Sequence, residues 1–162
     1  MIILGIDPGT VIIGYAFLEK RGADLTLLKA DAIRILSGGD KAERLATLHK
    51  KLTALIKKCR PNMISVEKLF FSKNQKTALD VAEARGVILS TAALAKIPVS
   101  EYTPLEVKVA STGYGKADKR QVREMVRAIL KLNEVTHLDD VTDAMAIAIT
   151  GAHLNKNREI HN

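Results

Sequence analysis

Apolar residues follow one another almost without interruption near the start of the chain, a pattern typical of buried β-strands. Residues 2–6 and 11–18 predict two strands, and Pro8 and Gly9 between them are turn residues. Residues 25–36 predict a third strand, which ends at a Ser-Gly-Gly sequence. Three strands joined by such short connections are typical of an antiparallel meander.

After these strands the apolar residues recur at helical spacing. A helix is expected from about Asp40 to Cys59, with Glu43 placed for a capping box and Pro61 placed to end the helix. Strands and helices then alternate: a strand at 63–67, a helix at about 75–95, a strand at 97–101, and helices at about 118–131 and 140–155. This alternation favours parallel strands joined by crossover helices.

Together the elements predict an α/β fold, in which a mixed five-stranded sheet has three antiparallel strands followed by parallel strands and is flanked by helices. Residues 104–117 show no clear period, and their two glycines favour a mobile loop. A chain of 162 residues suits one domain, which we place at residues 1–155. Residues 156–162 are expected to form a polar, frayed tail.

Composition narrows the possible partners and compartments. Hydrophobic residues make up 47% of the chain and the formal net charge is +7, which suits a polyanion partner or simply a basic soluble protein. The single cysteine, Cys59, excludes an intrachain disulfide and a thiolate zinc cluster, so a cytoplasmic location is expected. No apolar stretch approaches the roughly 20 residues that a membrane span needs, and no signal peptide is expected.

Four acidic residues stand out as candidates: Asp7, Glu67, Asp140 and Asp143, of which Asp7, Glu67 and Asp143 border strongly apolar segments. Each has an ordinary explanation when taken alone. Asp7 begins an Asp-Pro-Gly turn, Glu67 can point into water from a strand end, and the other two acids favour a helix N-terminus. Asp139 is expected to be a cap or a solvent-exposed residue.

The four acids mean more as a set. If the first and fourth strands are neighbours, Asp7 and Glu67 approach each other, and the last helix can bring Asp140 and Asp143 to them. Four carboxylates so placed could not all remain ionised without compensation. We therefore expect Mg²⁺ at this position, as two ions about 3.5–4 Å apart that clamp a phosphate, with Mn²⁺ as a possible substitute.

The surroundings of these acids resemble the RuvC family of Holliday-junction resolvases, which has an RNase H-like fold. The matching segments are Gly5-Ile-Asp7-Pro-Gly-Thr with Gly14-Tyr-Ala16, Val66-Glu67-Lys-Leu-Phe70-Phe, Asn74 through Ala84-Arg-Gly86, and Asp140-Val-Thr-Asp143 with the apolar run after it. They occur in family order over nearly the whole chain. The first segment alone is weak, since actin-like ATPases and YqgF-type proteins have similar openings.

The resemblance implies a homodimeric, metal-dependent endonuclease that cuts four-way DNA junctions by paired symmetric nicks, in recombination and repair. It implies that Asp7, Glu67, Asp140 and Asp143 are the catalytic metal ligands. A branch-migration motor of the RuvAB type is the implied protein partner. Two alternatives are a YqgF-like nuclease acting on RNA and a non-catalytic junction-binding module.

DNA contacts are expected from cations and one aromatic residue. The helix at 118–131 carries a biased basic side, for which the ordinary alternative is a merely solvated face; Val122, Met125, Val126 and Ile129 are expected to face the core. By resemblance, Lys108 and Lys119 lie near the scissile strand and Phe70 stacks on an exposed base, although core packing is the ordinary alternative for Phe70. The full set of expected DNA-binding residues is Phe70, Lys76, Arg85, Lys108, Lys116, Lys119, Arg120, Arg123 and Arg127.

The helix at 75–95 is rich in small residues, among them Ala78, Ala82 and Gly86. Such a side permits close approach of another helix, and it suits either packing on its own sheet or a two-fold interface. The resemblance favours the dimer interface.

Overall fold

The computed structural model describes residues 1–35, 38–68, 75–135 and 138–154, and for residues 75–77 the backbone alone. Its centre is a five-stranded sheet of order β3-β2-β1-β4-β5. The strands are β1 (Ile2–Asp7), β2 (Ile12–Arg21), β3 (Asp24–Arg34), β4 (Met63–Glu67) and β5 (Val99–Tyr102). β1 pairs antiparallel with β2 and parallel with β4, so the expected mixed sheet is confirmed.

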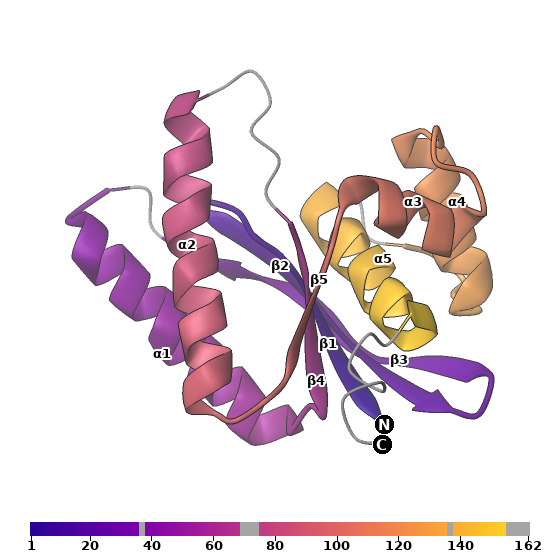
Figure 1. The fold of residues 1–162 in the computed structure, drawn as a ribbon, viewed down its shortest axis with the longest axis horizontal. Coiled ribbons are helices and arrows are strands. Elements are labelled where there is room, and N and C mark those ends of the chain that lie inside the picture. Colours follow the sequence, from indigo (N-terminus) through magenta and orange to yellow (C-terminus); the bar gives the residue numbers. More distant parts are fainter. Residues whose placement is uncertain (36–37, 69–74, 136–137, 155–162) are drawn as a thin grey trace.

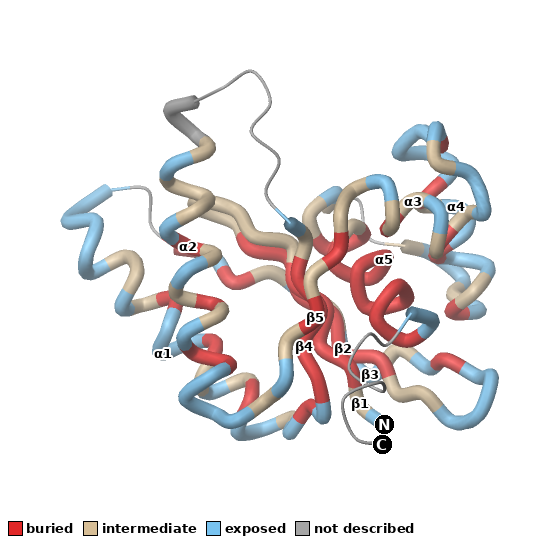
Figure 2. The backbone as a smooth tube through the Cα atoms, in the orientation of Figure 1, coloured by how far each residue is buried: buried red, intermediate tan, exposed pale blue. Residues whose placement is uncertain are grey.

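Helices cover both faces of this sheet (Figure 1). Two of them, α1 (Lys41–Cys59) and α2 (Gln75–Leu94), pack on one face, where Leu4, Phe17 and Ile64 are buried with Leu48 and Ile88. The other face carries α3 (Pro104–Thr112), α4 (Lys119–Ile129) and α5 (Asp139–Leu154). Most of α5 is buried, as the tube in Figure 2 shows, so this helix forms the centre of the second core.

Helix α3 corrects the expectation of a loop over 104–117. Thr103 caps the helix, its side chain accepting from the Glu106 main chain while the Glu106 carboxylate accepts from the Thr103 N–H. Pro104 occupies the first turn, and Gly113 ends the helix with a left-handed φ of 73°. The helix is therefore marked by its two caps rather than by its apolar period.

Several element boundaries also differ from those expected. The third strand ends at Arg34, and residues 36–37 lie outside the described part of the chain. The fifth strand begins at Val99 rather than at residue 97. The predicted tail at 156–162 is outside the described residues too. In the described ranges, no helix has the length and apolar character needed to cross a membrane.

Candidate active site

Asp7 and Glu67 end two neighbouring parallel strands. The register of β1 on β4 pairs Ile6 with Val66, so the next residue of each strand carries an acid at the same edge of the sheet. Both side chains lie at the end of an otherwise buried strand and are only half-buried themselves. The condition under which these two acids were expected to approach each other, that the first and fourth strands are neighbours, is therefore met.

Two glycines let α5 approach this edge closely. Gly14 lies opposite Asp7 in the β1–β2 ladder, and a Cβ built on Gly14 would overlap the main-chain carbonyl of Asp140. A Cβ on Gly5 would overlap the carbonyl of Ala144 in the same way. Glycine within a strand often marks such a close backbone approach, and here it sets the start of α5 against the strand that bears Asp7.

The four acids form one electrostatic cluster. The pKa of Asp7 is raised from 3.8 to about 8, first by burial and then by the negative charges of Asp143, Glu67 and Asp140, in that order of importance. Burial, followed by the charge of Asp143, raises the pKa of Glu67 to about 7. Without a compensating cation, the site therefore retains protons near neutral pH.

Asp143 belongs to the same cluster but has a cation close by. Burial raises its pKa, the positive charge of Lys119 lowers it, and the charges of Asp139 and Asp140 raise it. Lys119 also lowers the pKa of Asp7. The carboxylates of Asp7, Glu67, Asp140 and Asp143 accept no hydrogen bond from a described residue, and no three His, Cys, Asp or Glu side chains within the described ranges form a ready-made metal-binding group.

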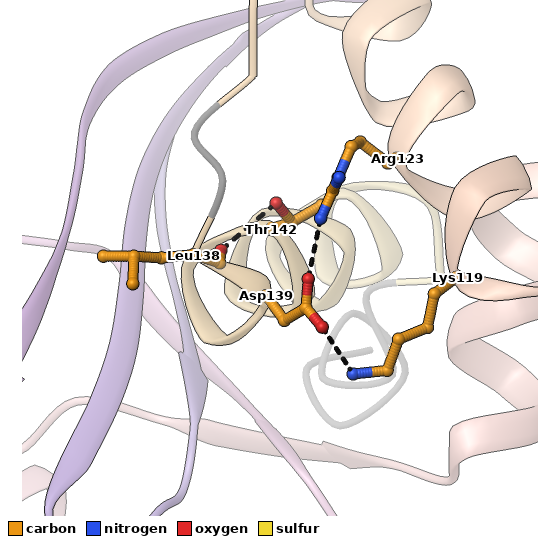
Figure 3. A network of polar contacts seen from close by, with 5 residues as sticks. All are labelled: Lys119, Arg123, Leu138, Asp139 and Thr142. Carbon is orange, nitrogen blue, oxygen red and sulfur yellow. Dashed lines mark hydrogen bonds and ion pairs between the residues drawn. The ribbon is translucent and has the colours of Figure 1, made fainter.

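Asp139 has a role that the sequence alone does not reveal. It lies in the first turn of α5, where its carboxylate accepts a hydrogen bond from Lys119 Nζ at 3.0 Å and another from Arg123 Nη2 at 2.7 Å (Figure 3). Both cations come from α4. The contact ties α4 to the start of α5, and it lowers the pKa of Asp139 and raises that of Lys119.

The expected core side of α4 needs one correction. Val122 and Val126 are buried and Leu130 follows them at the same spacing, but Met125 is 39% exposed. Residues four apart along α4 thus face the core, and Met125 lies beside this buried row. Ile129 is only partly buried against the core.

The remaining expected DNA-binding residues are in different surroundings. Lys116 and Arg120 are exposed, Lys108 is half-buried, and Arg127 pairs with Glu124 one turn away at 3.1 Å. Arg85 is half-buried and pairs with Glu101 of β5, an interaction that occupies its guanidinium inside the molecule.

Phe70 and the Lys76 side chain lie outside the described residues.

The small-residue side of α2 is partly open. Ala84, Ile88 and Ala92 face the core, whereas Ala78 and Ala82 are half-buried and Gly86 is exposed. A Cβ on Gly86 would meet nothing within 4 Å. Packing of α2 on the sheet therefore does not require a glycine at position 86.

Known proteins similar to this chain establish its family. The protein-family model described as "Crossover junction endodeoxyribonuclease RuvC" matches residues 3–151 of this chain. A protein of that name from Moorella thermoacetica is 51% identical over 152 residues, which cover 94% of this chain and 91% of the relative. The protein of the same name from Halothermothrix orenii is 48% identical over 149 residues, covering 92% and 90%.

Solved structures give the same result. The Thermus thermophilus RuvC structure superposes with a TM-score of 0.87 at 34% identity, covering 96% of this chain and 95% of that one. A second structure, T. thermophilus RuvC in complex with Holliday junction substrate, superposes with a TM-score of 0.87 at 31% identity and the same coverage.

Proposed function

The chain belongs to the RuvC family of crossover junction endodeoxyribonucleases, and from this premise we propose that it resolves four-way DNA junctions by paired, metal-dependent nicks, in recombination and repair. The observation that supports the catalytic part is the convergence of Asp7, Glu67, Asp140 and Asp143 at one edge of the sheet. We take these four as the catalytic acids.

The chemistry of this donor set fits a hard divalent cation. Carboxylate oxygens are the ligands that Mg²⁺ prefers, and Mn²⁺ can replace it at such sites. Burial and neighbouring negative charge raise the pKa values of Asp7 and Glu67, and a bound cation would offset both effects by stabilising the ionised carboxylates. The four acids would hold two ions, which when bound supply activation of water and charge neutralisation at a phosphate.

The residues around the acids would position the DNA. Lys119 lies close enough to Asp7 and Asp143 to lower the pKa of both, so it can place its charge beside a phosphate at the same site. In the DNA-free protein Asp139 holds Lys119 and Arg123, and a backbone phosphate would take the place of that carboxylate. Lys108, Lys116, Arg120 and Arg127 extend the proposed contact.

Paired nicks require two sites related by symmetry, and we propose that the chain acts as a homodimer. The open side of α2 around Ala78, Ala82 and Gly86 is the proposed interface, because two helices can approach closely only where side chains are small. A RuvAB-type branch-migration complex is the proposed partner of the dimer on the junction.

A comparison of substrates tests this function. With Mg²⁺ present, the protein should cut a mobile four-way DNA junction at paired positions and leave linear duplex of the same sequence intact. Preferential cutting of structured RNA would instead favour a YqgF-like RNA nuclease. Tight junction binding without cleavage in either Mg²⁺ or Mn²⁺ would favour a non-catalytic binding module.

A further inference from the structure

Positive charge is concentrated on α1. Residues 41–60, which are this helix and its C-cap, contain seven Lys and Arg residues but only one acid, Glu43, in a chain of formal net charge +7. None of these cations belongs to the proposed DNA contacts around the acids. The concentration therefore needs an explanation of its own.

Within the described ranges most cations of α4 have an acid partner, whereas on α1 only Lys41 does, pairing with Asp80 and Glu83 of α2. On α4, Lys119 and Arg123 pair with Asp139, and Arg127 pairs with Glu124. On α1, Lys50, Lys51, Lys57 and Lys58 are all exposed, and none forms an ion pair with any residue of the described ranges. Lys51 donates to the main-chain carbonyl of Arg34 at 2.7 Å, which orients its ammonium group without neutralising it.

These lysines form two rows on the helix. Lys50 and Lys57 are seven residues apart, as are Lys51 and Lys58, so each row spans two turns, or roughly 10 Å. Lys51 and Lys58 line a shallow hollow of about 370 Å³ between α1 and β3, together with Lys29 and Arg34.

We call these six residues the α1–β3 surface: Lys29, Arg34, Lys50, Lys51, Lys57 and Lys58.

The chemistry of this surface suits a phosphate backbone. A row of roughly 10 Å matches about three phosphates of one duplex strand at about 3.4 Å of axial rise each. A membrane surface is a poorer match, because α1 exposes no large apolar side chain and a membrane-bound amphipathic helix needs an apolar face. DNA is also the polyanion that the proposed function brings to the molecule.

The surface lies away from the proposed contacts on α4. Helix α1 covers one face of the sheet, whereas α4 and α5 cover the other (Figure 1). A single straight duplex segment cannot follow both faces, but the arms of a four-way junction diverge from the crossover. We infer that the α1–β3 surface binds the phosphates of a junction arm outside the crossover, an inference that rests on the proposed function.

Two lysine pairs and a charge-matched control test this inference in the full-length protein. One variant carries Lys51→Gln with Lys58→Gln, and another carries Lys50→Gln with Lys57→Gln. The control carries Arg21→Gln with Lys131→Gln, which removes two exposed cations elsewhere that pair with Glu19 and Asp24. Thermal unfolding of all three should coincide with that of the wild type, since every changed side chain is exposed.

Junction binding is measured against salt concentration with metal chelated, and hydroxyl-radical footprinting locates the protected sugar positions of the DNA backbone. Each lysine pair should weaken binding and lower the log–log salt slope by about 0.9 for every phosphate that the variant no longer neutralises, while the control keeps the wild-type slope. Protection should disappear on an arm and persist at the crossover. With saturating protein and Mg²⁺, the variants should cut the junction as the wild type does.

The inference would be overturned if both lysine variants kept the wild-type salt slope and footprint. It would also be overturned if the control lowered the slope by the same amount, or if the variants lost protection only at the crossover. Failure of the proposed function has a different signature, since the wild type itself would then leave the junction uncut whatever the lysine variants do.

Discussion

The ionised carboxylate of Asp7 costs the folded protein free energy unless a cation compensates it. Its pKa is raised from 3.8 to about 8 by burial and by three neighbouring acids. Between these two values the folded protein keeps a proton that the unfolded chain has released. Stability of the metal-free protein should therefore fall as pH rises from about 4 to about 8.

Asp7→Asn removes this dependence, because an amide does not ionise. The variant should match the wild type near pH 4 and exceed its free energy of unfolding by roughly 2–5 kcal/mol at pH 8 without metal, since one pKa unit is worth about 1.4 kcal/mol. Urea unfolding at both pH values measures the difference. Saturating Mg²⁺ should stabilise the wild type more than the variant. Equal stability at pH 8 in chelator would contradict the assignment.

Among single residues, the four candidate acids could be selected from the sequence, but their surroundings could not be predicted. Three of them border an apolar segment, and Asp140 lies three residues before Asp143; both signals are local. The Asp139 contacts are not local, since Lys119 and Arg123 precede Asp139 by 20 and 16 residues. Ion pairing of this kind depends on how α4 and α5 are oriented, so the basic side of α4 could be predicted but its neutralisation could not.

Among the helices and strands, the close contact between α5 and the sheet positions Asp140. Gly14→Ala should force α5 away from β2, because the added Cβ would overlap the Asp140 carbonyl. We expect stability to fall by about 1–3 kcal/mol, typical of overpacking, together with weakened Mg²⁺ binding. Gly38→Ala is the matched control, since a Cβ there meets nothing within 4 Å. Wild-type Mg²⁺ affinity in Gly14→Ala would show that this contact does not position the site.

Elements with a clear period or a marked end were predictable, and others were not. Strands β1, β2 and β4 and helices α1 and α5 follow from apolar patterning. Helix α3 is too short to show a clear apolar period. Its sequence signals are the Thr103–Glu106 capping box and Gly113, which mark the ends of a helix rather than a helical face. Gly5 and Gly14 were visible in the predicted strands, but the close contact that they make with α5 was not.

For the molecule as a whole, the proposed homodimer makes a prediction about Gly86. Gly86→Arg should leave the folded monomer as stable or more stable by up to about 1 kcal/mol, because helical glycine is unfavourable and the space beside it is open. The same change should break a close helix–helix interface. Ala46→Arg, at an exposed position of α1, should leave the dimer intact. Analytical ultracentrifugation measures the oligomeric state of both variants. A Gly86→Arg protein that remains dimeric would exclude this part of α2 from the interface.

The mixed sheet was predictable, because short connections favour antiparallel strands and a helix between two strands favours a parallel pair. The distribution of free charge over the whole surface was not, since it depends on which cations find acids after folding. On α4, three of the four cations pair with acids of the described ranges, whereas Lys50, Lys51, Lys57 and Lys58 of α1, on the opposite face of the sheet, do not.

Cleavage, as we propose it, depends on ions held by the four acids at the sheet edge. The decisive experiment is Mg²⁺-dependent nicking of a mobile four-way junction by the wild type and by Asp7→Asn, with junction binding measured on the same samples. We expect Asp7→Asn to bind the junction and to fail to cut it at any Mg²⁺ concentration. Wild-type cleavage by Asp7→Asn would contradict the proposed role of the acids.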